Sequence, residues 1–211
     1  MKQQEGRTIK DFSSLLGSRC YNPCLERHHK GFVMVFRENR SEICGAGDDR
    51  VLYVFLNEKF DAVSSVNTLP LPASHFEDPR LVQFGEKWLL FLGGPKGDPK
   101  NWRERCMYFC EVAITENSIE VTDGPRRIGS PFGLARCEKN WVPFVHSGTL
   151  CLVYSVFPHV VLSLDINTGE TELRSMSWAA FDFPGNYISC GTPPKAISEE
   201  YYCSFLALLS F

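Results

Sequence analysis

The sequence lacks several features that would decide its class at once. It holds no run of about 18 apolar residues, the length that a membrane-spanning helix needs. Residues 1–20 lack the apolar core of a signal peptide. There is no excess of basic charge, since 22 lysines and arginines stand against 25 acidic residues, for a net charge of −3. We therefore expect a cytoplasmic protein that binds neither a membrane nor nucleic acid.

A complete set of metal ligands is also missing. Of the nine cysteines, Cys20 with Cys24 and Cys106 with Cys110 have C-x3-C spacing, but no second pair or His-x3-His completes a zinc site. Residues 45–49, GAGDD, are followed by neither Lys-Ser/Thr nor a helix start, and so predict a turn rather than a phosphate cradle. We expect reduced, mostly buried thiols and no metal or cofactor.

Long amphipathic helical patterns are absent, whereas signals for strands are frequent. The chain has 16 Phe and 7 Tyr, residues that favour strands. Strand-like runs at residues 50–57, 106–115 and 160–166 are separated by turn-forming residues, and residues 165–173 have the pattern of a hairpin. The sequence therefore predicts an all-β protein.

A repeat runs through the chain. Four segments each have a proline as their second residue, followed by a short apolar step, a polar turn that usually holds Gly, and an apolar, aromatic strand. The segments are residues 22–37, 78–93, 142–155 and 192–207, and their prolines are Pro23, Pro79, Pro143 and Pro193. The prolines recur at a spacing close to one four-stranded propeller blade with its loops, about 40–50 residues.

We predict that residues 1–211 form a single β-propeller domain of about four blades. The fourth repeat ends with its inner hairpin and lacks outer strands, which leaves an unpaired edge. We therefore expect a chain truncated at the C-terminus, a fragment, or a decayed copy of a longer protein. In a propeller the inner strand of each blade lines a central channel, so the residues beside the four prolines should converge on one axis.

Several motifs stand at this phase of the repeats, in a fixed order. They are Asn22-Pro23 with Arg37, Glu77-Asp78-Pro79-Arg80, Glu138-Lys139-Asn140 leading to Pro143, Pro158-His159, and Gly191-Thr192-Pro193. This order resembles the five-bladed propeller glycosidases, and in particular glycoside hydrolase family 130, the β-mannoside phosphorylases and their hydrolase relatives. The resemblance covers about residues 20–207. Members cleave β-mannosidic bonds with inversion, typically using inorganic phosphate.

The resemblance implies roles for individual residues. Asp78 matches the position of the general acid, and Arg80 matches an arginine of the same motif. Arg37 and Lys139 become candidates to contact phosphate or sugar hydroxyls. The further candidates for substrate or phosphate contacts are Asn22, Glu77, Asn140 and His159. The expected partner is an oligosaccharide, with inorganic phosphate as a co-substrate, and the sequence sets no oligomeric state.

The residue types suit this chemistry. Inverting cleavage needs a protonated carboxyl group at the leaving oxygen and a nucleophile on the opposite face of the sugar ring. Phosphate arrives as an anion, so one acid (Asp78) with cationic clamps would suffice, and arginine offers phosphate two parallel hydrogen bonds. Asp78 must then carry its proton at neutral pH, which burial or neighbouring Glu77 could favour. Hydrolysis needs a second carboxylate, for which Glu138 and Asp182 are the nearest candidates.

Each candidate also has a structural interpretation. Asp78-Pro79 could be a turn with Arg80 as the ion-pair partner, and Glu77 could point away, because adjacent strand residues face opposite sides. Other polar positions could be solvated strand ends, loops or turns, and Trp141 is typical of a core; these positions are Arg37, Lys139, Asn140, His159 and His28-His29.

A second function therefore stays open beside the enzyme. The chain could be a catalytically inactive propeller that binds glycan or protein. The lack of a fifth blade, and of a histidine after Gly191-Thr192-Pro193, favours this alternative. The retained Asp78, Arg80 and Lys139 favour the enzyme.

Overall fold

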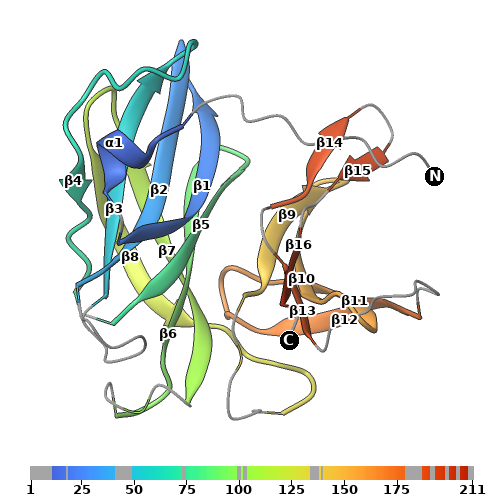
Figure 1. The fold of residues 1–211 in the computed structure, drawn as a ribbon. Coiled ribbons are helices and arrows are strands. Elements are labelled where there is room, and N and C mark those ends of the chain that lie inside the picture. Colours follow the sequence, from blue (N-terminus) through green and yellow to red (C-terminus); the bar gives the residue numbers. More distant parts are fainter. Residues whose placement is uncertain are drawn as a thin grey trace.

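The computed structural model of the chain consists of antiparallel sheets that follow one another along the sequence (Figure 1). Within the part of the chain that the structure describes, three of these sheets have four strands each, and two have two strands. The described residues are 11–17, 19–40, 49–72, 75–98, 101, 104–133, 138, 140–178, 187–190, 193–197, 200–202 and 205–208.

The three four-stranded sheets correspond to the first three repeats. The first holds β1 (Cys20–His28), β2 (Gly31–Asn39), β3 (Asp49–Asn57) and β4 (Asn67–Thr68). The second holds β5 (Glu77–Phe84), β6 (Lys87–Pro95), β7 (Arg105–Ile114) and β8 (Ile119–Arg127). The third holds β9 (Val142–His146), β10 (Thr149–Ser155), β11 (His159–Leu164) and β12 (Thr171–Ser177). Each strand pairs with the next in the chain, which is the order of a propeller blade.

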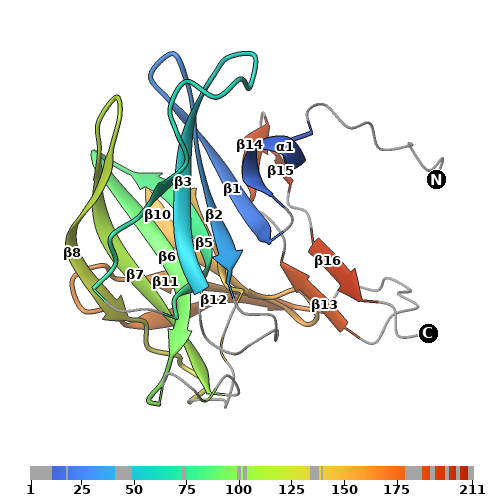
Figure 2. The ribbon, with the colours of Figure 1, turned by 60° about the vertical axis from the view of Figure 1, so that its left-hand side comes forward.

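The first strands of the three blades lie next to one another. β1 contacts β5, and β5 contacts β9, so the anchoring segments with Pro23, Pro79 and Pro143 form an inner layer. Figure 2 shows the first sheet (blue to cyan) beside the second sheet (green). The inner strands of the first three repeats therefore adjoin, as a propeller requires.

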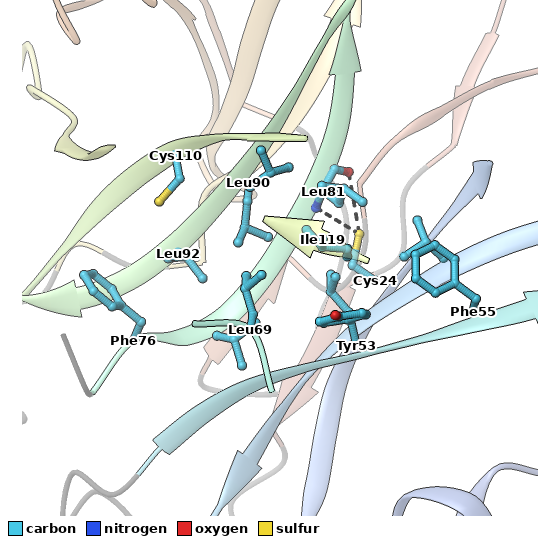
Figure 3. Packing of buried hydrophobic residues seen from close by; sticks show 14 residues of the cluster. Cys24, Tyr53, Phe55, Leu69, Phe76, Leu81, Leu90, Leu92, Cys110 and Ile119 are labelled. Carbon is cyan, nitrogen blue, oxygen red and sulfur yellow. Dashed lines mark hydrogen bonds between the residues drawn. The ribbon is translucent and has the colours of Figure 1, made fainter. Parts of the chain in front are cut away.

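Hydrophobic side chains join each blade to the next. Between the first two sheets, Val33 and Val35 of β2 and Tyr53 of β3 belong to one core with Leu90 and Leu92 of β6, and Figure 3 shows part of this cluster. The inner strands also meet there, because the Sγ atom of Cys24 accepts a hydrogen bond from the Leu81 N–H at 3.2 Å. The Cys24 thiol lies 3.7 Å from the Leu81 carbonyl oxygen.

The second blade is buried on both of its faces. In β6, Leu90 and Leu92 enter the core shared with the first blade, whereas Leu89 and Phe91 enter the core shared with the third blade. Alternate residues of a strand point to opposite faces. A strand covered on both sides therefore has a continuous apolar run, as in residues 88–92, in place of alternating polarity.

The fourth repeat differs from its prediction. β14 (Lys195–Ile197) pairs with β15 (Glu200–Tyr202), and β16 (Phe205–Leu208) pairs with β13 (Tyr187–Cys190). The prediction that residues 201–211 form the inner hairpin of the fourth repeat is therefore wrong, because the hairpin that follows Pro193 consists of β14 and β15. The pairing of Ile197 with Glu200 closes a tight hairpin earlier, so the apolar run at 205–208 pairs with a strand that precedes Pro193.

Helix is confined to one turn in the described ranges. α1 (Ser13–Leu16) places Leu15 and Leu16 against the face of the first blade that points away from the second. None of the helices in the described part of the chain has the length and apolarity needed to cross a membrane.

Candidate functional site

The inner strands of the first two blades carry the same local irregularity. The register of β1 shifts between Tyr21 and Cys24, and that of β5 shifts between Glu77 and Arg80. Within these bulges Asn22 and Asp78 both have φ of 54°, a left-handed conformation that Asn and Asp adopt more readily than other non-glycine residues. The proline that follows each of them donates no hydrogen bond, so it fits a bulge where the ladder is interrupted.

The bulge in β5 places two neighbouring acidic side chains on one partner. Arg37 Nη1 lies 2.7 Å from Glu77 Oε2 and 3.2 Å from Asp78 Oδ1. In a regular strand these two carboxylates would face opposite sides. The interpretation in which Glu77 points away from Asp78 is therefore wrong, and its cause is a register shift that the sequence pattern does not reveal.

Arg37 is held by its place in β2. It follows Val33 and Val35 on the face that points to the second blade, so its side chain continues the row that forms the core between the blades. Its Nε donates to Asp49 Oδ1 at 2.7 Å, and its guanidinium lies 5.0 Å from the centre of the Tyr21 ring. The side chain is only 7% exposed, so the solvated interpretation of Arg37 is wrong.

The electrostatic surroundings keep Arg37 charged. Burial lowers the pKa of Arg37, but the hydrogen bond to Asp49 raises it, and the charges of Glu77 and Asp78 act in the same direction. The net shift of the Arg37 pKa is upward. Arg37 is thus the cationic centre of three carboxylates, and removing it would leave buried, unpaired negative charge.

A second arginine, Arg105, holds the far side of Glu77. Arg105 Nε lies 3.4 Å from Glu77 Oε1, and Arg105 Nη1 donates to the carbonyl oxygen of His75 at 3.2 Å. Gly93 faces Glu77 across the strand pair, and a Cβ atom there would lie 3.2 Å from Glu77 Cγ. The glycine therefore leaves room for the Glu77 side chain between the two guanidinium groups.

Sequence reasoning missed Asp49 and Arg105. A shared position could have pointed to them, because each is the first residue of the third strand of its blade. His159 holds the same position in the third blade, at the start of β11. This places the half-buried His159 two strands out from β9.

The equivalent bulge residues of the first two blades contact each other directly. Asn22 Nδ2 donates to Asp78 Oδ1, the same oxygen that Arg37 approaches. Arg80 Nη1 donates to the carbonyl oxygens of Pro79 at 2.8 Å and Asn22 at 3.2 Å. Arg80 is buried and contacts backbone carbonyls, so the interpretation of Arg80 as the ion-pair partner of Asp78 is wrong.

Glu138, which precedes the third blade, is joined to the second blade through its backbone. The backbone N–H of Glu138 donates to the Arg105 carbonyl oxygen at 2.9 Å, and the Glu138 side chain accepts a hydrogen bond from the Tyr154 hydroxyl at 3.1 Å. Burial raises the pKa of Tyr154 to about 12, and the charge of Glu138 contributes. Trp141, 2% exposed, packs 5.0 Å from the Tyr154 ring, which confirms its core interpretation.

Most of the candidate residues that the structure describes belong to one network. It connects Asn22, Arg37, Glu77, Asp78 and Arg80 through direct contacts. Asn140 precedes β9 with φ of 64°. Lys139 and Asp182 lie outside the described residues. Within the described ranges, no group of three or more His, Cys, Asp or Glu side chains is arranged to hold a metal ion.

The network is closed and electrically balanced. Its three carboxylates, Asp49, Glu77 and Asp78, are matched in number by three arginines, of which Arg37 and Arg105 pair with them directly. Arg80 is the third arginine, and each of the six residues is at most 6% exposed. Asp78 Oδ1 is occupied by Asn22 and Arg37. A proton that Asp78 gives to a leaving group would therefore have to be carried on Oδ2.

Comparison with known proteins bears on the fold. Neither a protein-family model nor a curated protein matches the chain. Among solved structures, it is similar to the GH43_1 enzyme from Xanthomonas citri complexed with xylose, with a TM-score of 0.62 and 11% identity, over 88% of this chain and 62% of that one. It is also similar to the RS223 β-xylosidase (TM-score 0.60, 11% identity, 90% and 65% covered). Arabinanase Arb43A from Bacillus subtilis is a third (TM-score 0.52, 15% identity, 90% and 66% covered).

The fold is an incomplete β-propeller of the five-bladed glycosidase type. The chain spans less than two thirds of the length of each of these three structures. At 11–15% identity the likeness concerns the fold, and a fold alone does not determine function. The comparison therefore agrees with the predicted propeller fold, and the similar structures named here are a GH43_1 enzyme, a β-xylosidase and an arabinanase, not members of family 130.

Proposed function

We propose that this propeller is a carbohydrate-active protein that cleaves glycosidic bonds of oligosaccharides at the inner ends of its blades. The observation that carries the proposal is the meeting of Asn22 and Asp78, equivalent bulge residues of successive blades, on the buried Arg37. The similar solved structures support it, since they include a β-xylosidase and a GH43_1 enzyme crystallised with xylose and with xylotriose.

In this proposal Asp78 is the general acid. Its Oδ1 atom is fixed by Asn22 and Arg37, so Oδ2 is the atom that would protonate the leaving oxygen. Arg37 is already paired with three carboxylates, and its charge is therefore not free for phosphate. The contacts to phosphate or sugar hydroxyls would fall to Arg80 and Lys139, in an inverting, phosphate-dependent reaction of the family 130 kind. Glu138 would be the second carboxylate if water is the nucleophile.

The test is an activity assay with two substrates. The chain is incubated with β-1,4-mannobiose and with β-1,4-xylobiose, each with and without inorganic phosphate, and the products are separated by chromatography. Sugar 1-phosphate formed only with phosphate indicates phosphorolysis, and free monosaccharide indicates hydrolysis. Asp78→Asn should abolish turnover, whereas Glu120→Gln, which replaces an exposed residue of β8, should leave turnover intact.

A second function is favoured by the burial of the network. Glu77, Asp78 and Arg37 are each at most 6% exposed and are engaged with one another. A network closed in this way could instead serve to hold the blades together, in a propeller that binds glycan or protein without cleaving it. Saccharide binding without turnover, unchanged by Asp78→Asn, would favour this second function over the first.

A further inference from the structure

A groove lies at the opposite end of the strands from the charged network. It has a volume of about 660 Å³ and runs between the hairpin that joins β1 to β2, at Arg27 and His28, and the end of the second blade at Gln83 and Trp88. Gln83 lies six residues beyond Glu77 along β5, which is about 20 Å at the rise of an extended strand. The groove is therefore spatially separate from the site proposed above. We call it the far-end groove.

The charges of the far-end groove are balanced. Arg27 and Lys87 supply two cations, and Glu86 and Glu111 supply two anions. Lys87 Nζ lies 2.7 Å from Glu111 Oε2, and these side chains are 49% and 28% exposed. An ion pair as exposed as this contributes little to stability. Both side chains can therefore leave this pair and bind the hydroxyl groups of a ligand at a small cost in free energy. The lining has no surplus cation for a phosphate and no surplus anion for a basic ligand.

The two walls of the groove are fixed to one another. His28 Nε2 lies 3.1 Å from the carbonyl oxygen of Thr115, a contact that joins the first blade to the second. The His28 ring also lies 6.0 Å from the ring of Trp88, edge to face. His28 is therefore half-buried, whereas His29 is exposed, as the solvated interpretation expects. A groove whose walls are fixed loses less conformational entropy when a ligand binds.

The lining combines an aromatic surface with hydrogen-bonding groups. The half-buried Trp88 and Ile114 provide apolar area, and the exposed Gln83 amide provides donors and acceptors. The Thr122 hydroxyl, which donates to the Glu111 carbonyl oxygen, provides an acceptor. A second groove of about 460 Å³ shares His28 and His29 with the first and is lined in part by Phe32, Phe55 and Val63. The two grooves therefore adjoin at His28 and His29.

We propose that the far-end groove binds a neutral oligosaccharide, at a site distinct from the charged network around Arg37. A sugar ring presents hydroxyl groups that both donate and accept, around an apolar C–H face. That combination matches a lining of balanced charge with an aromatic side chain. A nucleotide or sugar phosphate would call for surplus positive charge, and an alkyl chain would call for a lining without Lys87, Glu111 and Gln83. The inference does not depend on turnover at Asp78.

The test uses the full chain, labelled with ¹⁵N, and two probes: β-1,4-xylotriose and β-1,4-mannotriose. We expect at least one probe to shift the amide signals of residues 83–88 and 111–114 and the indole signal of Trp88, with saturation as the probe concentration rises. Gln83→Ala removes one exposed hydrogen-bonding group, and it should weaken binding about tenfold. Lys87→Met, which keeps the length of the side chain, should weaken binding in the same direction.

The controls distinguish binding in the far-end groove from binding at the charged network around Arg37. Trp88 packs partly against the core between the blades, so Trp88→Phe is preferred to alanine, and a native-like amide spectrum confirms its fold. Asp78→Asn and Glu120→Gln should leave the groove shifts unchanged. Three results would overturn the inference: no saturable shift at residues 83–88 with either probe, full binding in both Gln83→Ala and Lys87→Met, or groove shifts that are lost in Asp78→Asn.

Discussion

Asn22 donates its side-chain amide to Oδ1 of Asp78, and the two residues hold the same place in successive blades of the propeller. Each lies in a bulge of an inner strand, each has a left-handed backbone conformation, and each precedes a proline. The repeat therefore does more than pack hydrophobic faces together. It delivers matched polar side chains to one place, where the buried Arg37 joins them.

Removing the cation at the centre of this network should destabilise the fold strongly. Arg37→Gln leaves Asp49, Glu77 and Asp78 buried without their shared partner, so the free energy of unfolding should fall by about 3–5 kcal/mol. The measurement is urea denaturation followed by circular dichroism. The matched control is Arg27→Gln, because the pair of Arg27 with Glu58 is 66% and 67% exposed and should cost under about 1 kcal/mol to lose.

A double variant tests whether the loss arises from unpaired charge. Asp49→Asn removes the carboxylate that Arg37 Nε binds at 2.7 Å. In the Arg37→Gln background it also removes one buried negative charge, so the double variant should be more stable than the sum of the single losses predicts. Strictly additive losses would contradict the ion network as the cause.

Close packing at Gly93-Gly94 of β6 predicts that alanine substitutions at two nearby glycines have different effects on stability. A Cβ atom at Gly94 would lie 2.7 Å from the Phe76 ring and 2.9 Å from the Tyr108 ring, so Gly94→Ala should destabilise the chain by about 1–3 kcal/mol. Gly97 has no atom within 4 Å of the equivalent position, so Gly97→Ala should change the free energy of unfolding by under about 0.5 kcal/mol. Thermal or urea unfolding compares the two, and equal effects would contradict the close approach of β6 to the Phe76 ring.

The sequence could predict the strands of the first three blades because apolar runs and turn residues are local signals. The prolines Pro23, Pro79 and Pro143 also marked the inner strands correctly. The prediction for residues 201–211 was wrong because β13 pairs with β16, and these two strands lie on either side of Pro193. An alignment of repeats compares segments that each begin near a proline, so it cannot reveal a pairing of this kind.

Much of the candidate site depended on geometry that the sequence pattern does not contain. Glu77 and Asp78 share one partner only because of a bulge, and Asp49 looked like part of a turn although its side chain is fully buried. Arg105 lay in a polar stretch before a strand and carried no motif. Burial depth and register decide these roles, and both arise from tertiary pairing.

The pair formed by Tyr154 and Glu138 predicts a coupled titration. Burial, together with the carboxylate of Glu138, raises the pKa of Tyr154 to about 12, so Glu138→Gln should lower it. The folded pKa exceeds the unfolded value of 10.0, so this group's contribution to stability is present below pH 10 and is lost as the pH rises toward 12. Ultraviolet difference titration follows the formation of phenolate, and comparison with Tyr154→Phe identifies the part of the signal that comes from Tyr154. A Tyr154 pKa that does not change in Glu138→Gln would contradict the coupling.

His28 predicts a dependence on pH at the other end of the blades. Burial lowers the pKa of His28 below 6.5, the hydrogen bond to the Thr115 carbonyl partly opposes this, and the charge of His29 adds to the lowering. The unfolded chain therefore binds this proton more readily than the folded chain does. Stability from this group is complete above pH 6.5 and is lost as the pH falls through the folded pKa.

Proton NMR of the imidazole ring tests the shift directly, and urea unfolding at several pH values tests its consequence. His28→Gln should flatten the fall in the free energy of unfolding between neutral and mildly acidic pH, because the variant has no ring to protonate. A His28 midpoint at or above 6.5 would contradict the lowering of its pKa by burial. In that case the hydrogen bond to the Thr115 carbonyl, which favours the protonated ring, would outweigh burial, and the free energy of unfolding would not fall at mildly acidic pH because of this residue.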